Sequence, residues 1–352
     1  MSFFDGREVL AALIVVVATL FVVTVVFSMY AVGLRLRHQA RDRRRDAFAE
    51  KWREPTLGAL AAPESIASFT AAIRDDERIH FVGFAVQYAR RLRGDGRDTI
   101  RALAKPYLGV IARRADSSNV EIRARAIQTL GLLGLPEHAP RVMAALDDRS
   151  PLVAMVAARA LSQEESPEYA AAVLGRLGRF EGWNRRFLAS MLAAMGPKVA
   201  STLREGLRNA GAQPRARAVL AEALLLQGDP LAGDVAAEVL DTASDRDLQI
   251  TALRLLASVG RPDHAATVRR HTDAADEVVR AQALRALGAV GSESDVRGLI
   301  EAMSDPSPWV ALSAARAVLD AGGRSALAEI GSSDRATAAI ARQVLSEERV
   351  AA

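Results

Sequence analysis

A pattern of apolar and small residues that returns about every 31 residues limits this chain to very few folds. Each copy spans thirteen residues, and the copies begin at Ile122, Val153, Asn184, Ala216, Leu248, Val279 and Val310. Apolar or small side chains fall at positions 0, 4, 5, 8 and 12 of the copies, on one face of a helix, with Asn184 and Glu165 as the departures. A fixed period of about 20 to 50 residues is typical of solenoids, because one helix pair needs neighbours to bury its apolar face.

A second helix is expected between consecutive copies. Prolines that suit a first helical turn stand there: Pro136, Pro167, Pro197, Pro230 and Pro262. Most copies end in or beside glycine, which favours a left-handed cap. The pattern therefore predicts an all-α, right-handed solenoid of stacked helical hairpins.

The ends of the stack are expected to differ from its middle. Residues 63–93 predict a divergent first hairpin, and residues 97–114 an entry helix kinked at Pro106. After Gly322 the helices are expected to shorten into a truncated cap.

These copies resemble the short HEAT-like repeats of bacteria, the type also found in phycobilisome lyases. The resemblance covers about residues 97–346 and rests on the Ala and Leu spacing, on the starts Ile122-Arg123 and Val279-Arg280, and on preceding aspartates: Asp116, Asp148, Asp273 and Asp305. It implies that the patterned helix lines the concave side and that an arginine at position 1 pairs with the aspartate of a turn. Arg123, Arg185, Arg217 and Arg280 fit, whereas Ala154, Gln249 and Ala311 are expected to interrupt the ladder.

An uncharged run of 26 residues, Val9 to Leu34, predicts a transmembrane helix ahead of the solenoid. At about 1.5 Å per residue it reaches about 39 Å, beyond the ~30 Å hydrocarbon core. A secretory signal peptide is the alternative, but no basic region precedes the run and no cleavage site follows it. The lipid bilayer is therefore an expected partner.

Basic residues concentrate after this run, which predicts an outside N-terminus and a cytoplasmic solenoid. We expect three parts: residues 1–34 with the anchor, a basic juxtamembrane helix and linker over 35–62, and the solenoid over 63–352. The helix is expected to end at Glu54, before Pro55. Candidate membrane-surface residues are Arg41, Arg43, Arg44, Arg45, Phe48 and Trp52. A topology determinant and spacer is the alternative role.

The charge argues against a nucleic-acid interface. The chain carries 46 Lys and Arg against 42 Asp and Glu. Residues 35–54 alone account for an excess of about +4, so the solenoid is nearly neutral, and a phosphate-binding surface needs concentrated basic charge. The strong preference for arginine over lysine suggests a GC-rich bacterial genome.

No pattern in the chain predicts catalytic chemistry. There is no cysteine, and the histidines are scattered, so we expect no metal, no cofactor, no small-molecule ligand and no enzymatic activity. His264 and His271 share a helix face, but about 10 Å separates two such positions. The resemblance leaves a lyase-type enzyme as the alternative, which predicts a deep pocket.

A polar row remains as the candidate binding surface. Position 6 of the copies, which faces away from the core, holds Gln128, Arg159, Ser190, Glu222, Arg254, Arg285 and Arg316. The arginines of this row (Arg159, Arg254, Arg285 and Arg316) suit the carboxylates of an acidic partner segment. A solvated row without a ligand is the alternative.

The third copy departs most from the pattern and adds two candidates, Trp183 and Arg186. Trp309 stands in the same register as Trp183, which favours a packing role instead. The sequence thus predicts a membrane-anchored scaffold or adaptor that binds partner proteins of a membrane-associated complex.

Overall fold

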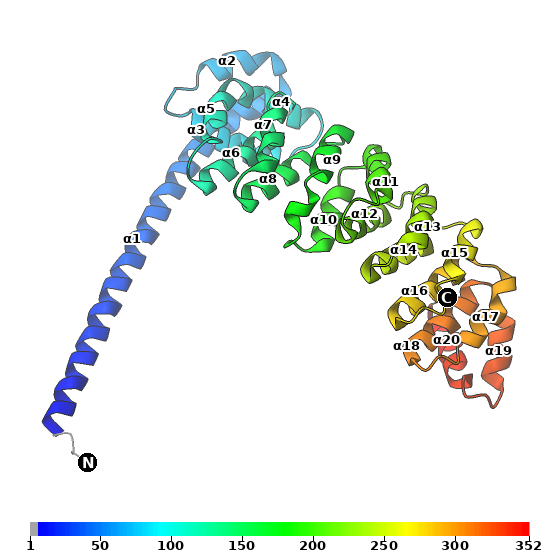
Figure 1. Ribbon diagram of the computed structural model, residues 1–352. Coiled ribbons are helices and arrows are strands. Elements are labelled where there is room, and N and C mark those ends of the chain that lie inside the picture. The colour runs from blue at the N-terminus through cyan, green and yellow to red at the C-terminus, as the bar shows by residue number, and fades with distance from the viewer. Residues whose placement is uncertain (1–5, 135, 352) are drawn as a thin grey trace. The chain divides into compact units, whose positions relative to one another are not determined.

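The fold is all-helical over the residues that the structure, a computed structural model, describes: 6–134 and 136–351. Side chains are described for these residues apart from 6–16, 31, 34, 36–46, 49, 63 and 349–351. The chain divides into two compact units (Figure 1). Unit 1 comprises residues up to Arg114 together with Leu132–Gly134, and unit 2 comprises Ala115–Gly131 and the residues from 135 onward.

Unit 1 contains a long first helix and a group of short ones. Helix α1 spans Gly6–Ala61. The remaining elements are the 3₁₀ turn η1 (Pro63–Ser65), α2 (Ile66–Ala71), α3 (Arg78–Ala89), α4 (Asp95–Ala104), η2 (Lys105–Tyr107) and α5 (Leu108–Arg114). The kink expected at Pro106 is present, because the turn η2 separates α4 from α5.

The expected end of the first helix at Glu54 is wrong, because α1 continues through Pro55 to Ala61. Trp52, Thr56 and Ala59 lie one helical turn apart and are all buried. Proline normally disfavours a helix interior. Here the packing of this buried face within unit 1 outweighs that preference, so the segment expected to be a linker is part of the core.

The end of α1 is held by aromatic and ionic contacts. Phe48 stacks on Trp52 and on His80, with ring centroids 5.0 and 4.9 Å apart. Trp52 also meets Phe81 edge-on at 5.3 Å. Lys51 Nζ donates to Glu77, whose carboxylate is buried, at 2.7 and 2.9 Å.

Unit 2 consists of stacked helical hairpins, as the repeat predicts. Its patterned helices are α6 (Val120–Leu133, shared with unit 1), α8 (Pro151–Leu161), α10 (Arg185–Ala193), α12 (Pro214–Gln227), α14 (Arg246–Val259), α16 (Glu277–Val290) and α18 (Pro308–Asp320). The helices between them are α7 (Ala139–Ala144), α9 (Pro167–Leu174), α11 (Ala200–Arg208), α13 (Ala232–Thr242), α15 (Ala265–Arg269), α17 (Val296–Ala302) and α19 (Arg324–Ser332). Several 3₁₀ turns join them: η3 (Ala145–Asp147), η4 (Leu177–Phe180), η5 (Pro197–Val199), η6 (Pro262–His264) and η7 (Glu293–Asp295).

The two sets of helices form two layers within unit 2. Figure 1 places α12, α14, α16 and α18 side by side in one layer, each in contact with the next, and α11, α13, α15 and α17 in the other. The patterned alanines and leucines are buried between them, for example Ala252, Leu256, Ala283 and Leu287. The predicted core face is therefore confirmed.

Two details of the repeat differ from expectation. The final helix α20 spans Ala338–Ala351, as long as a patterned helix, and packs against both α18 and α19, so it is not a shortened cap. Gly228 has the left-handed backbone expected of a cap, and Gly196 and Gly322 also have positive φ, whereas Gly260 and Gly291 have negative φ. At these two positions a Cβ would clash with the carbonyl oxygen four residues earlier, so small size is the requirement.

Candidate functional site

The position 6 row lies mainly on the exposed face of the patterned helices. Gln128, Arg159, Ser190, Arg285 and Arg316 are exposed, and Arg254 is partly buried. Glu222 is the exception, since only 7 % of its surface is exposed. Arg185 Nε donates to its Oε2 at 3.2 Å, which turns Glu222 inward and breaks the row between Ser190 and Arg254.

Three arginines of the row lie on adjacent helices: Arg254 on α14, Arg285 on α16 and Arg316 on α18. Within the described part of the chain, neither Arg254 nor Arg285 donates a side-chain hydrogen bond that would occupy it. Arg316 Nη2 donates to Glu347 on α20 at 2.9 Å, with both side chains about half exposed. This end of the row therefore already holds a carboxylate.

Asp320 adds a second carboxylate at the same end. Desolvation raises the pKa of this side chain, and the positive charge of Arg285 acts in the opposite direction. Carboxylates therefore lie near both Arg285 and Arg316, at the α18 end of the row.

The arginine at position 1 pairs with a turn aspartate where both residues are present. Arg123 donates to both oxygens of Asp148, each at 3.0 Å. Arg280 donates to both oxygens of Asp305, at 2.9 and 3.1 Å. The resemblance-based expectation is thus confirmed for these two pairs. Asp116 instead pairs with Arg141 at 2.8 Å, so it is not part of the ladder.

The aromatic residues of the third copy form a partly exposed surface on α10. The rings of Trp183 and Phe187 are stacked, 6.1 Å apart, and Arg186 beside them is exposed. Arg215 Nη2 donates to the carbonyl of Trp183 at 2.9 Å, which ties this corner to α12. Trp309, in the same register, has 55 % of its surface exposed.

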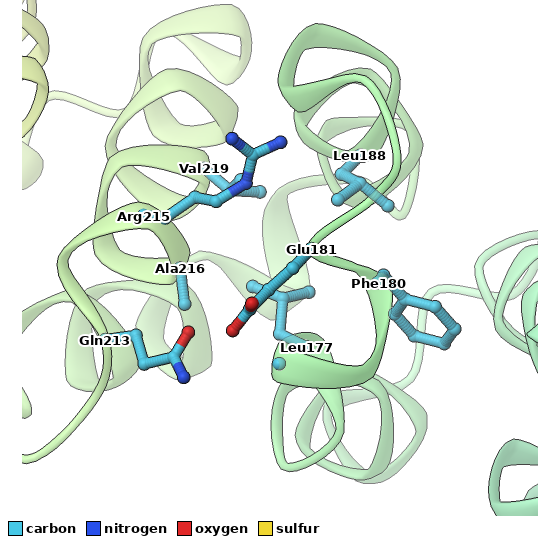
Figure 2. Close-up of a pocket in the computed structure, with 9 residues that line it drawn as sticks. Leu177, Phe180, Glu181, Leu188, Gln213, Arg215, Ala216 and Val219 are labelled. Atoms are coloured by element: carbon cyan, nitrogen blue, oxygen red, sulfur yellow. The ribbon is translucent and has the colours of Figure 1, made fainter.

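A small notch lies below this surface (Figure 2). Leu177, Leu188 and Val219 line its floor, and Glu181, Gln213 and Arg215 lie around its rim. Its enclosed volume is only about 10 Å³, room for about one water molecule. Small-molecule sites usually enclose about 300–1,000 Å³, so the notch is far too small for a substrate.

The candidate membrane-surface residues are placed in two groups. Arg41, Arg43, Arg44 and Arg45 lie on α1, outside the described side chains. Trp52 has only 2 % of its surface exposed and packs against Phe81, so it is a core residue and cannot face lipid. Phe48 is partly buried in the same stack.

The expectation that His264 and His271 share a helix face is wrong, because His264 ends the turn η6 and His271 lies beyond the end of α15 at Arg269. His264 is buried, accepts from the backbone N–H of Arg261 at 3.0 Å through Nδ1, and places Nε2 2.9 Å from Asp234. His271 Nδ1 lies 3.2 Å from the Thr267 carbonyl oxygen. In the described residues, no group of three or more His, Asp or Glu side chains is arranged to hold a metal ion.

Two contacts were not foreseen in the sequence. Glu77 lies outside the repeated pattern and Glu222 stands at its outward-facing position 6, yet both are buried and each is reached by a basic side chain from another helix. For the pair of Arg185 and Glu222, the one signal in the sequence is Arg185 itself. It stands at position 1 of its copy, but the next repeat has no turn aspartate to pair with it.

No helix among the residues described here is both long enough and apolar enough to cross a membrane. The first part of the expected span, Val9 to Val16, lies outside the described side chains.

Comparison with known protein families finds a resemblance in the repeats. A family model for HEAT repeats matches residues 108–193 and 233–320, just under half of the chain. No curated protein matches the chain.

Solved structures resemble the chain at low identity. Human deoxyhypusine hydroxylase in complex with glycerol is 18 % identical, with a TM-score of 0.31, over 68 % of this chain and 96 % of that one. A mutant of Kap121p is 14 % identical, with a TM-score of 0.42, over 72 % of this chain but only 34 % of that one, so the chain spans about a third of Kap121p. An engineered protein is 15 % identical, with a TM-score of 0.36, over 83 % and 95 % of the two chains.

Proposed function

We propose that this chain is a non-catalytic, membrane-anchored scaffold that binds partner proteins through the arginine row Arg254, Arg285 and Arg316. The observation that carries the proposal is the position of these side chains on the outward faces of three adjacent helices, α14, α16 and α18. Guanidinium groups form paired hydrogen bonds with carboxylates. The contact between Arg316 and Glu347 supports an acidic partner, since one member of the row already binds a carboxylate from a neighbouring helix.

The anchor is proposed from the uncharged run of Val9 to Leu34. Large apolar side chains in its described part are exposed on all sides of α1, among them Leu20, Phe21, Val22 and Val23. Such a helix needs an apolar environment around it. The basic residues that follow favour an outside N-terminus and a cytoplasmic solenoid in the inner membrane of a bacterium. Anchoring would raise the effective concentration of the row near membrane-associated partners.

The row is tested by reversing its charge in the full-length protein. The triple variant R254E/R285E/R316E should keep its helical content and melting temperature, because the three side chains are at least partly exposed. In-membrane crosslinking should then capture less partner protein. The matched control R125E/R297E/R335E makes the same change in net charge at exposed arginines outside the row.

The two triple variants separate the possible results. Undiminished capture by the row variant, or equal loss in both variants, would show that the row is not the binding surface. Unfolding of the row variant alone would make the row structural. The topology is tested separately with reporter domains fused to the C-terminus, which should report a cytoplasmic location; a periplasmic signal would contradict the orientation.

A further inference from the structure

The two intact pairs at position 1 share one geometry. Arg123 Nη1 donates to the carbonyls of Ser117 and Ser118, both at 2.9 Å, while its other nitrogens hold Asp148. Arg280 repeats this arrangement with Ala274 and Ala275, at 2.9 and 3.0 Å. In both pairs the aspartate stands two residues before the N-cap serine of the next patterned helix, Ser150 or Ser307.

Most other repeats lack both members of the pair. One repeat has Ala154 in place of the arginine. Two residues before the N-cap Asn184 of the next patterned helix, it has Gly182 in place of the aspartate. Another repeat has Gln249 in place of the arginine and Ala274 in place of the aspartate. Gln249 keeps only the contact with its own loop, because Nε2 donates to the Ala243 carbonyl at 2.7 Å. In these repeats the arginine and the aspartate are present or absent together. Arg185 and Arg217, two of the four arginines at position 1, are the exceptions to this rule.

Arg185 is one exception, and other acids compensate for it. Its turn position is Gly211, but its guanidinium lies 3.2 Å from Glu222 and 3.2 Å from Asp247. The positive charge of Arg185 is therefore matched by carboxylates from the next two patterned helices.

Arg217 is the exception that has no such compensation. Only 8 % of its surface is exposed, and Nε donates to the Leu207 carbonyl at 2.9 Å, the one hydrogen bond of this side chain among the described residues. The position two residues before the N-cap Asp245 is Ala243. Burial lowers the pKa of Arg217, and no carboxylate charge opposes that effect.

Ala243 occupies the place of the missing aspartate. It is the C-cap of α13 with an extended backbone (φ −76°, ψ 125°), close to that of Asp148 (φ −54°, ψ 143°). The backbone at Ala243 therefore resembles that of the intact pairs. The arginine is placed differently, because Arg123 uses Nη1 for its loop carbonyls, whereas Arg217 uses Nε for the Leu207 carbonyl. Among the described residues, Nη1 and Nη2 of Arg217 then have no hydrogen-bond partner. The side chains of Asp148 and Asp305 are 15 % and 14 % exposed, so this position lies near the surface of the stack, and Ala243 is itself partly exposed.

We propose that Nη1 and Nη2 of Arg217 bind a single carboxylate or small oxyanion in place of the missing aspartate. The buried guanidinium supplies a pair of parallel N–H donors that matches a carboxylate. The anion neutralises a charge that burial otherwise leaves unpaired, which stabilises the folded repeat. The anion is either free in solution or the carboxylate of a side chain of a partner protein.

The test is the melting temperature of the full-length protein in detergent, with formate or phosphate replacing chloride at constant ionic strength. The wild type should show a saturable rise of about 2–4 °C. A243D supplies the carboxylate from within, so it should start with a higher melting temperature and lose the response. R217M removes the cation and should lose the response as well.

An intact pair provides the matched control. D305A should leave Arg280 without its carboxylate, so it should gain an additional response to formate. D273A, which changes an exposed aspartate outside the ladder, should respond as the wild type does. A wild type whose response is no larger than that of A243D would overturn a free-anion site.

Partner capture then identifies the source of the carboxylate. If A243D weakens crosslinking to a partner, the carboxylate belongs to that partner, and unchanged capture together with a formate response assigns it to a free anion. If A243D neither loses a formate response nor loses capture, the proposal is wrong. The row variant R254E/R285E/R316E leaves Arg217 in place, so failure of the proposed scaffold function and failure of this site are distinguishable.

Discussion

Arg280 and Asp305 lie 25 residues apart in the chain and join two neighbouring repeats through two hydrogen bonds, of 2.9 and 3.1 Å. The same guanidinium holds two carbonyls of its own loop. The side chains of Arg280 and Asp305 are 19 % and 14 % exposed, so water does not readily replace either partner. The pair therefore fixes the turn before α18 to the start of α16.

Removing the aspartate should destabilise unit 2. D305A leaves a largely buried guanidinium without its acceptor, and an unsatisfied group of this kind costs about 1–3 kcal/mol. The free energy of unfolding in urea should fall by that amount. The control D273A changes an exposed aspartate and should stay within about 0.5 kcal/mol of the wild type. Equal effects of the two substitutions would mean that the pair adds nothing.

The contribution of Asp305 should depend on pH. Its hydrogen bond with Arg280 is the largest effect on its pKa, which is lowered in the folded state. A lowered folded pKa means that the stabilisation is complete above the unfolded value of about 4 and is lost as the pH falls through the folded value. The difference in unfolding free energy between the wild type and D305N should be constant near neutral pH and shrink below about pH 4. A difference that grows on acidification would contradict the ion pair.

Close packing of α16 on α18 should make Gly288 sensitive to enlargement. A Cβ at this position would lie 2.7 Å from the Cα and 2.9 Å from the Cβ of Ala317. Because the backbone of one of the two helices would have to move, G288A should lower the free energy of unfolding by about 1–3 kcal/mol. G298A on α17 meets no atom within 4 Å, so it should be neutral or stabilise by up to about 1 kcal/mol. Urea unfolding of both variants measures the contrast, and similar midpoints would refute the close approach.

The buried position of Trp52 predicts a large cost for its removal. W52A should destabilise unit 1 by about 3–5 kcal/mol, as is usual for a buried aromatic residue. W309A is the matched control, because Trp309 is more than half exposed and should cost less than about 1 kcal/mol. Thermal unfolding followed by circular dichroism compares them. A stable W52A protein with reduced affinity for anionic vesicles would restore the lipid-surface role.

The periodic pattern predicted the patterned helices and their buried alanines and leucines, because a helix buries the face that its own spacing defines. It did not predict Glu222. Position 6 of α12 faces outward by spacing, but Arg185 from α10 approaches it and the carboxylate turns inward. A contact of this kind depends on which helix lies beside which, and the spacing within one copy does not contain that information.

Local rules also failed where the partners of a residue come from distant parts of the chain. Pro55 marks a helix end by propensity, yet α1 continues because Trp52, Thr56 and Ala59 all have a core to enter. The aromatic residues that form this core, such as Phe81 and Phe84, are separated from Trp52 by a loop and two short elements. Helix propensity therefore predicts a helix end at Pro55, as would be expected for this segment in isolation.

Arg185 lies between Glu222 of α12 and Asp247 of α14 and contacts both. Detaching α14 from the stack would remove Asp247 from the guanidinium of Arg185 and weaken its contact with Glu222. Neighbouring hairpins joined in this way should open together rather than one at a time. The middle of unit 2 should accordingly open to amide hydrogen exchange as one cooperative block that includes α10, α12 and α14.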